Sequence, residues 1–235
     1  MAATEPTAAA VVLSVGGSVL LTGEKDAEYL GELAALLRSV GAERPLAVTV
    51  GGGRTARDYI RLGRALGLTE VELDEVGIDV TRLHARLLAG RIGPPTPAHP
   101  PTSVREAIAA LAGASPVVLG GTEPGHTTDG VAALLAVRLR AARVVNATDV
   151  DGIYDRDPRA SPGARRLDRL SWADLRSMIH RASSGEAGQS LPFDRLGADL
   201  LARARIPLAV VHGRTLPNLG AALRGESFPG TWVEP

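Results

Sequence analysis

The sequence predicts an α/β fold in which a mainly parallel sheet is covered by helices on both faces. Short apolar runs with the length of buried strands alternate with segments whose apolar residues recur at helical spacing. Four of these runs lead into clusters rich in glycine or aspartate, at 16–18, 51–53, 120–129 and 146–157. The 235 residues, 45% of them hydrophobic, suffice for one large domain with a buried core. Strands that alternate with helices are typical of parallel sheets with helices on either side.

The first half of the chain begins with a polar stretch, residues 1–8, that we expect to be a flexible tail. A proline-rich stretch, 90–102, predicts a surface connection at which a seam between two lobes could begin, and Ser103 with Glu106 predicts a capped helix to residue 111. The other expected elements are strands at 9–15 and 45–50 and helices at about 27–40, 54–66 and 74–88.

The second half repeats the alternation. Residues 155–170 are polar and contain two prolines, so we expect a long exposed loop, and residues 183–190 are expected to be flexible. Ser171 with Asp174 predicts the start of another capped helix. The other expected elements are strands at 116–119, at 144–145 leading into the cluster at 146, and at 209–211, and helices at 129–139, 194–205 and 216–223.

Composition excludes several classes of protein. Without cysteine the chain has no disulfide or thiolate chemistry, and a formal net charge of +0 gives no support for a nucleic-acid or anionic-membrane partner. No segment has the roughly 18 uninterrupted apolar residues of a membrane span, and the first residues lack the basic region of a signal peptide. We therefore expect a cytoplasmic enzyme that acts on small molecules.

The four clusters point to phosphate chemistry. Backbone N–H groups at glycine turns and helix N-termini bind anions, and carboxylates can hold magnesium. Because the carboxyl ends of parallel strands meet at one edge of a sheet, the clusters are expected to line one crevice. Ordinary strand-to-helix loops also favour these residue types. Neither the P-loop motif nor the G-x-G-x-x-G dinucleotide motif occurs.

The motifs in this order resemble the amino acid kinase superfamily, and within it the archaeal-type uridylate kinases. They are GGSV at 16–19, GGGRTARDYI at 51–60, GTEPGHTTD at 121–129 and NATDVDGIYDRDP at 146–158. The resemblance implies a three-layer αβα sandwich formed by a single domain over 1–235, with an acceptor lobe at about 9–142 and an ATP lobe at about 143–235. It also implies transfer of the ATP γ-phosphate to UMP with Mg²⁺, in a homo-oligomer that is usually a hexamer.

The resemblance assigns site residues position by position. Three are implied in catalysis: Gly17, Arg57 and Asp199. ATP would contact Gly16, Gly17, Ser18, Gly53, Arg57, Thr148, Tyr154 and Asp157. UMP would contact Gly52, Asp74, Gly121, Thr122, Glu123, Pro124, Gly125, His126, Thr127 and Thr128. No residue is assigned as a metal ligand.

Two departures from the family pattern concern positive charge. Ser14 and Asp199 stand where related sequences carry lysines, and Arg195 or Arg203 on the Asp199 helix could replace the missing charge. The alternatives are a kinase for another small metabolite, or a non-catalytic nucleotide or oxyanion binder similar to the molybdate and tungstate storage proteins.

Overall fold

The computed structural model describes residues 9–183 and 193–235, and its centre is a seven-stranded sheet in the order β3-β2-β1-β4-β8-β9-β7. The strands from β3 to β8 are parallel neighbours, β9 runs antiparallel to β8, and β7 is parallel to β9. The strands are β1 (Val11–Val15), β2 (Leu46–Val50), β3 (Val117–Leu119), β4 (Arg143–Thr148), β7 (Arg169–Ser171), β8 (Leu208–His212) and β9 (Thr231–Glu234). The predicted mainly parallel sheet is confirmed.

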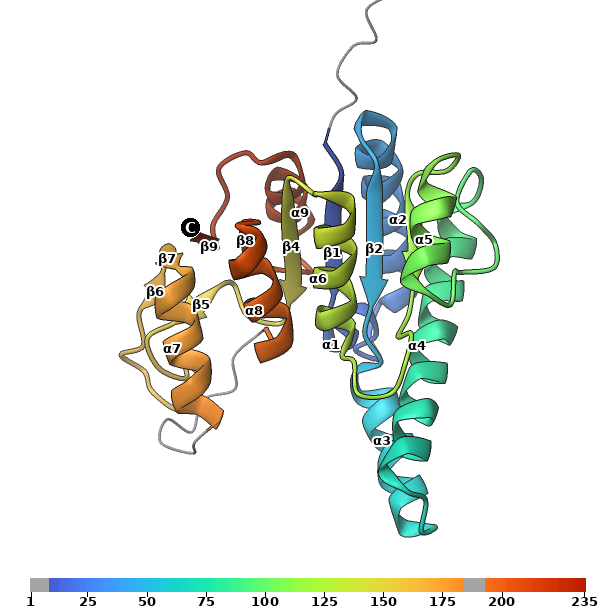
Figure 1. The fold of residues 1–235 in the computed structure, drawn as a ribbon, viewed down its shortest axis with the longest axis horizontal. Coiled ribbons are helices and arrows are strands. Elements are labelled where there is room, and N and C mark those ends of the chain that lie inside the picture. Colours follow the sequence, from blue (N-terminus) through green and yellow to red (C-terminus); the bar gives the residue numbers. More distant parts are fainter. Residues whose placement is uncertain (1–8, 184–192) are drawn as a thin grey trace, which may run out of the picture.

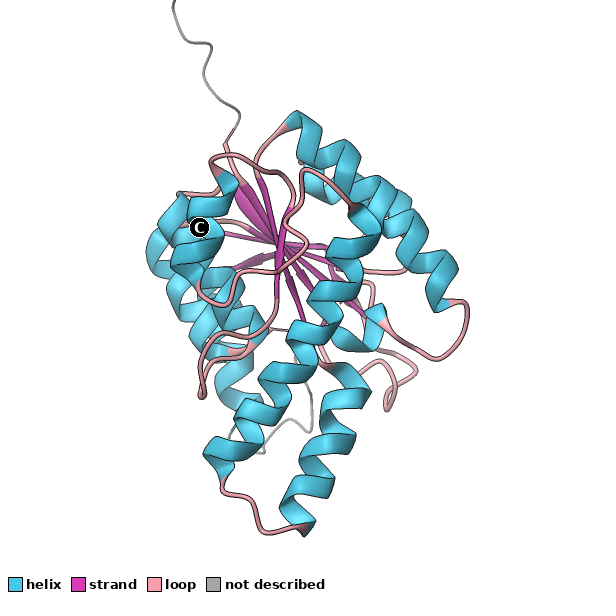
Figure 2. Cartoon of the chain, turned by 90° about the vertical axis from the view of Figure 1, so that its right-hand side faces the viewer, coloured by secondary structure: helices cyan, strands magenta, loops and turns pink. Residues whose placement is uncertain are grey.

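Helices cover both faces of this sheet (Figure 2). The helices are α1 (Gly17–Leu20), α2 (Asp26–Glu43), α3 (Gly53–Ala65), α4 (Glu70–Ile92), α5 (Val104–Leu111), α6 (Thr128–Leu139), α7 (Trp172–Ser183), α8 (Arg195–Ala204) and α9 (Leu216–Arg224). The α2, α4 and α9 helices pack on one face and α5, α6, α7 and α8 on the other, so two apolar cores sandwich the sheet. Successive residues of β1 alternate between them, with Val11 and Leu13 in one core and Val12 in the other.

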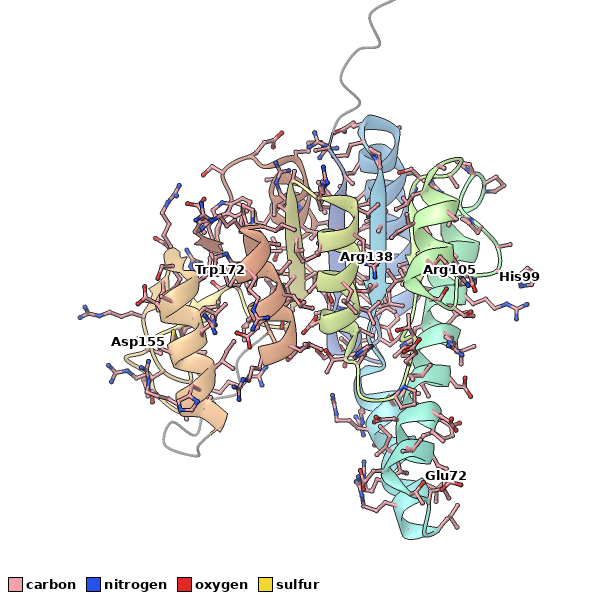
Figure 3. All side chains as sticks on the ribbon, in the orientation of Figure 1. Glu72, His99, Arg105, Arg138, Asp155 and Trp172 are labelled. Atoms are coloured by element: carbon pink, nitrogen blue, oxygen red, sulfur yellow. The ribbon has the colours of Figure 1, made fainter. Side chains whose placement is uncertain are left out.

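The parallel strands point their carboxyl ends toward α1 and α3 (Figure 1). Beyond that edge, α3 and the first part of α4 project from the body as a helical hairpin, with Glu72 near its end (Figure 3). The α4 helix is longer than the predicted 74–88 because a capping box starts it earlier: Glu72 N donates to Thr69 Oγ1 and Thr69 N to the Glu72 carboxylate. No helix in the described parts of the chain is long and apolar enough to cross a membrane.

The expected loop at 155–170 is wrong in part. It contains β6 (Arg166–Leu167), which pairs antiparallel with β5 (Ile153–Tyr154), and the first residues of β7. Thr231 Oγ1, from β9, accepts a hydrogen bond from Ile153 N (2.8 Å) and donates one to Leu167 O (2.6 Å). One side chain of the C-terminal strand therefore holds the β5–β6 pair against the main sheet.

The remaining differences are small. Ser103 caps α5 as predicted, but the Glu106 carboxylate accepts from Thr102 N, so the reciprocal bond lies one residue earlier. Ser171 Oγ accepts from Asp174 N at the start of α7, as predicted. The flexible segments predicted at 1–8 and 183–190 lie outside the described residues, apart from Ser183 at the end of α7.

Candidate functional site

A cavity of about 480 Å³ lies at the carboxyl ends of β1, β2 and β4. Three of its walls are the turn after β1, the turn after β2 and the first turn of α6, and a fourth is the end of β4 with the segment that follows it. All four predicted clusters therefore contribute, although the third does so only through Thr128 and Asp129. This is the crevice expected where parallel strands end.

The turns after β1 and β2 touch through their backbones. A Cβ atom added to Gly17 would lie 2.6 Å from the carbonyl carbon of Gly52, and one added to Gly53 would lie 2.9 Å from Gly17 Cα. Gly53 also has a φ of 58°, which side-chain-bearing residues rarely adopt. Only glycine allows this approach, so the two turns form one continuous wall of backbone.

The α3 helix presents its N-terminus to this wall. Gly52 is the N-cap and supplies no side-chain hydrogen bond to the first-turn amides, so these N–H groups remain available to a ligand. Arg57, in the second turn of α3, lines the same cavity. Backbone amides, the positive end of a helix dipole and a guanidinium together favour a bound anion such as a phosphate.

The first turn of α6 is fixed by hydrogen bonds to β1 and α8. Ser14 Oγ donates to Asp129 Oδ1 over 2.7 Å, and Thr127 Oγ1 accepts from Gly130 N and donates to Asp194 Oδ2. Asp194 in turn caps α8 by accepting from Gly197 N (2.7 Å). Burial, together with the nearby Asp194 charge, raises the pKa of Asp129 to about 7, despite the Ser14 hydrogen bond, which lowers it.

The fourth wall carries the three residues predicted for the ATP side, Thr148, Tyr154 and Asp157. Tyr154 donates its hydroxyl proton to Asp151 Oδ1 over 2.6 Å, which raises the pKa of the phenol. Arg159, which the sequence interpretation missed, also lines the cavity and donates to Asp149 Oδ2 (2.7 Å). The polar segment after β4 thus forms a cavity wall that carries both acidic and basic side chains.

The residues predicted for the acceptor lie together, but mostly beside the cavity. Asp74 Oδ2 accepts from Gly125 N (2.8 Å), which connects α4 to the predicted loop 121–128. The loop is also held by Thr81 Oγ1, which accepts from Gly121 N (2.6 Å), and by Arg82, whose guanidinium donates to the carbonyls of residues 121 and 122. Of the predicted acceptor residues, Gly52 and Thr128 line the cavity itself, and Asp74 and residues 121–127 do not.

The structure places Asp199 away from the other predicted catalytic residues. Its carboxylate accepts from Arg176 Nε of α7 over 2.6 Å and lies 4.0 Å from Arg195 Nε. These residues line a separate groove between α7 and α8, whereas Gly17 and Arg57 line the main cavity. Neither Arg195 nor Arg203 is among the residues that line the main cavity.

Several lining residues were not predicted as site residues. They are Gly51, Asp129, Asn146, Asp149, Val150, Gly152, Pro158, Arg159, Phe193 and Asp194. The Asp129 position could have been found because it ends the TTD motif in the first turn of a predicted helix. Asp194 and Phe193 follow residues 184–192 and reach the cavity only through the packing of α8 on α6, which no local pattern signals. Within 9–183 and 193–235, no group of three or more His, Asp or Glu side chains could hold a metal ion.

Comparison with known proteins identifies the fold. The sequence pattern of the amino acid kinase family matches residues 9–212. The uridylate kinase of Methanothermobacter thermautotrophicus is 41% identical over 225 residues, which cover 96% of this chain and 99% of that protein. The uridylate kinase of Archaeoglobus fulgidus is 42% identical over 217 residues, which cover 92% and 96%.

Solved structures agree with these sequence relatives. The crystal structure of uridylate kinase from Archaeoglobus fulgidus superposes with a TM-score of 0.85 at 40% identity, and the match covers 95% of this chain and 99% of that one. The UMP kinase from Bacillus anthracis matches with a TM-score of 0.77 at 20% identity, covering 96% and 95%, and so shares the fold. With a three-layer αβα sandwich, a family pattern over most of its length and relatives at about 40% identity, the chain belongs to the amino acid kinase family.

Proposed function

We propose that this protein is an ATP-dependent nucleoside monophosphate kinase that transfers the γ-phosphate of ATP to UMP and forms UDP. The observation that carries the proposal is the cavity in which two interlocked glycine turns, the N-terminus of α3 and Arg57 meet. Phosphoryl transfer requires positioning and charge neutralisation more than covalent chemistry. Backbone amides and one guanidinium around a shared point supply both, and relatives that are about 40% identical are named uridylate kinases.

In this proposal ATP lies along the fourth wall. Thr148, Tyr154 and Asp157 would hold the adenosine part, and the turn at Gly16, Gly17 and Ser18 would hold the phosphates. The assignment is supported by the continuity of these residues along one side of the cavity. The N-terminus of α3 and Arg57 would stabilise the negative charge on the phosphoryl group during transfer.

UMP would enter from the side of α4. The loop 121–128 and Asp74 would form its pocket, with Thr128 and Gly52 at the boundary with the shared cavity. The hydrogen bond from Gly125 N to Asp74 gives the pocket a defined shape before substrate arrives. The chain would thus be divided into an acceptor lobe, about 9–142, and an ATP lobe, about 143–235, that meet at the interlocked turns.

Magnesium would arrive with the nucleotide rather than at a site that the protein builds alone. The described residues contain no group of three or more acidic or histidine side chains that suits a metal ion. Mg²⁺ in phosphate-transfer enzymes is held largely by substrate phosphates and water, so the residues present fit an ion that comes bound to ATP. When bound, it would offset phosphate charge.

The test is a phosphoryl-transfer assay over a panel of acceptors. ATP and Mg²⁺ are supplied with UMP, CMP, GMP, AMP and a phosphorylated metabolite without a base, and nucleoside diphosphate formation is followed by chromatography. UDP formation that exceeds product formation from the other acceptors supports the proposal. Transfer to the metabolite alone would indicate another small-molecule kinase. Tight binding of molybdate or tungstate without any transfer would indicate an oxyanion binder.

We also propose that the protein forms a homo-oligomer through the α3–α4 hairpin. Large apolar side chains are about half exposed or more on the hairpin, at Tyr59, Leu62, Leu66 and Val71, and farther along α4, at Leu83 and Leu87. Tyr59 and Leu62 lie on one face of α3, three residues apart, and Leu66 follows four residues later as the C-cap. A second copy of the chain would cover them, and a hexamer is the assembly that the resemblance implies. Light scattering of Leu62→Asp/Leu66→Asp should give a smaller species than the unmodified protein.

A further inference from the structure

The Asp129 carboxyl lies above a row of buried polar side chains in the middle of the sheet. Ser14 is in register with Thr49 of β2 and Asn146 of β4, and each is at most 2% exposed. Val12, Ala47 and Val144, two residues earlier on each strand, pack in the core beneath α6, so the three polar residues face α6 as well. Asp129, in the first turn of α6, accepts a hydrogen bond from Ser14 Oγ (2.7 Å) and lines the cavity.

The charges around Asp129 leave its carboxylate without a cation. No ion pair of Asp129 is found among the described residues. The charged neighbour that affects it is Asp194 at the start of α8, whose negative charge disfavours a second carboxylate. The other titratable groups around the cavity are Arg57 on α3, and Asp149, Tyr154, Asp157 and Arg159 after β4. The polar side chains that β1 and β2 place on this face are the hydroxyls of Ser14 and Thr49.

Phosphate binding would add negative charge to this arrangement. A phosphate group beside Asp129 favours the neutral carboxyl, because like charges in a partly buried site repel each other. A neutral carboxyl can still accept from Ser14 through one oxygen and donate its own proton through the other. A carboxylate cannot donate, so protonation would turn a repulsive neighbour of phosphate into a hydrogen-bond donor.

We propose that Asp129 takes up one proton from solvent when a phosphate-bearing nucleotide binds, and that the neutral carboxyl donates a hydrogen bond to a phosphate oxygen. The proposal rests on the proposed function, since it requires nucleotide in this cavity. Ser14 is then a positioning residue: its hydroxyl fixes one carboxyl oxygen and leaves the other directed to the ligand. The pKa of Asp129 in the free protein, about 7, makes this proton uptake accessible at neutral pH.

The experiment is isothermal titration calorimetry of ADP, and separately of UMP, at pH 8 in HEPES and in Tris. The two buffers differ in ionisation enthalpy, so the difference in observed heat gives the protons taken up per site. We expect at least about half a proton for the unmodified protein with one of the two nucleotides, and none for Asp129→Asn. Because the asparagine amide can donate permanently, this variant should also bind at pH 8 at least as tightly as the unmodified protein.

Ser14→Ala provides a second test. The hydroxyl favours the ionised carboxyl, so its loss should move the midpoint of the proton-uptake profile to higher pH. Binding without proton uptake in the unmodified protein at pH 7–8 would overturn the proposal and leave the proposed function intact. Uptake that persists in Asp129→Asn would assign the proton to another group and also overturn it. Absence of binding by both nucleotides would overturn the proposed function itself.

Discussion

Replacement of Gly17 by alanine tests the contact between the two glycine turns. The added Cβ atom would lie 2.6 Å from Gly52 C and closer still to Gly53 N, whereas ordinary contacts of this kind measure 3.4–4 Å. The neighbouring atoms are backbone, so no side chain can rotate away, and the turns must separate by at least about 1 Å. A displacement of that size between groups that position a reacting phosphate costs about 10²-fold in rate. The strain should also lower the free energy of unfolding by about 1–3 kcal/mol.

The assay is steady-state UDP formation by Gly17→Ala, with urea unfolding to establish that the variant is folded. Gly16→Ala is a matched comparison for stability, not for activity, because Gly16 is in the same proposed phosphate turn: its φ is −58°, and its added Cβ would lie 3.3 Å from Ala147 O, which requires a shift of only tenths of an ångström. A remote control, Gly90→Ala on α4, meets no atom within 4 Å and should gain about 0.5–1 kcal/mol of stability with unchanged activity. If folded Gly17→Ala retains the unmodified kcat/KM, the two turns do not position the phosphates.

Three further predictions concern charge. Arg57→Ala should lower kcat by about 10²–10³ in the same assay, because Arg57 lines the cavity at the α3 N-terminus; an effect on KM alone would contradict its role in the transition state. Asp199→Lys should change kcat less than about twofold and cost about 0.2–1 kcal/mol in urea unfolding, because its carboxylate pairs with Arg176 outside the cavity; a tenfold rise in kcat would contradict this placement. Desolvation raises the pKa of Asp26, but hydrogen bonds from the preceding turn and Arg214 outweigh it and lower the pKa to about 2. The contribution of ionised Asp26 to the free energy of unfolding is therefore present above about pH 4 and lost as pH falls through 2. Asp26→Asn should lower the free energy of unfolding by about 1–2 kcal/mol at pH 7 and by little at pH 2. An equal loss of stability at both pH values would show that the charge is not involved.

The sequence was sufficient for the sheet and for the glycine turns at its edge because both are local signals. An apolar run followed by glycines identifies where a buried strand ends, and parallel order then brings the strand ends to one edge. The three glycines at 51–53 indicated a turn after a strand, and the structure adds that the backbone of Gly53 packs against that of Gly17. Gly17 lies in another turn, 36 residues before Gly53, and no local sequence pattern indicates that the two meet.

The helix that carries Asp199 shows the limit of such reasoning. Helical spacing correctly placed Arg195 one turn from Asp199, and the structure has the two 4.0 Å apart. Whether the Asp199 side of α8 faces the cavity depends on the packing of α7, whose Arg176, 23 residues earlier in the chain, donates to the Asp199 carboxylate. Helix orientation is set by tertiary packing, so the catalytic position that the resemblance implied for Asp199 could not be checked from local pattern.

The segment 155–170 was misjudged for a related reason. Its composition is that of a loop. The two strands that begin in it, β6 at Arg166 and β7 at Arg169, are only two and three residues long. They exist because distant residues provide hydrogen-bond partners, chiefly Thr231 and Trp232 of β9. Strand propensity is weak beside such context.

The Thr231 hydroxyl has a consequence for the order in which the molecule is completed during synthesis. Ile153 and Thr231 are 78 residues apart in the chain, so the β5–β6 pair leaves the ribosome well before the residue that holds it. The glycine turns and α3 contact each other, β1, β2 and α4 within residues 11–92, and α6 is completed by contacts with α8 (Arg195–Ala204), so all of them can assemble before β9 is translated. The wall proposed for adenosine is therefore the last part of the cavity to form, and a nascent chain can acquire the turns proposed for the phosphates before it acquires the wall proposed for the rest of ATP.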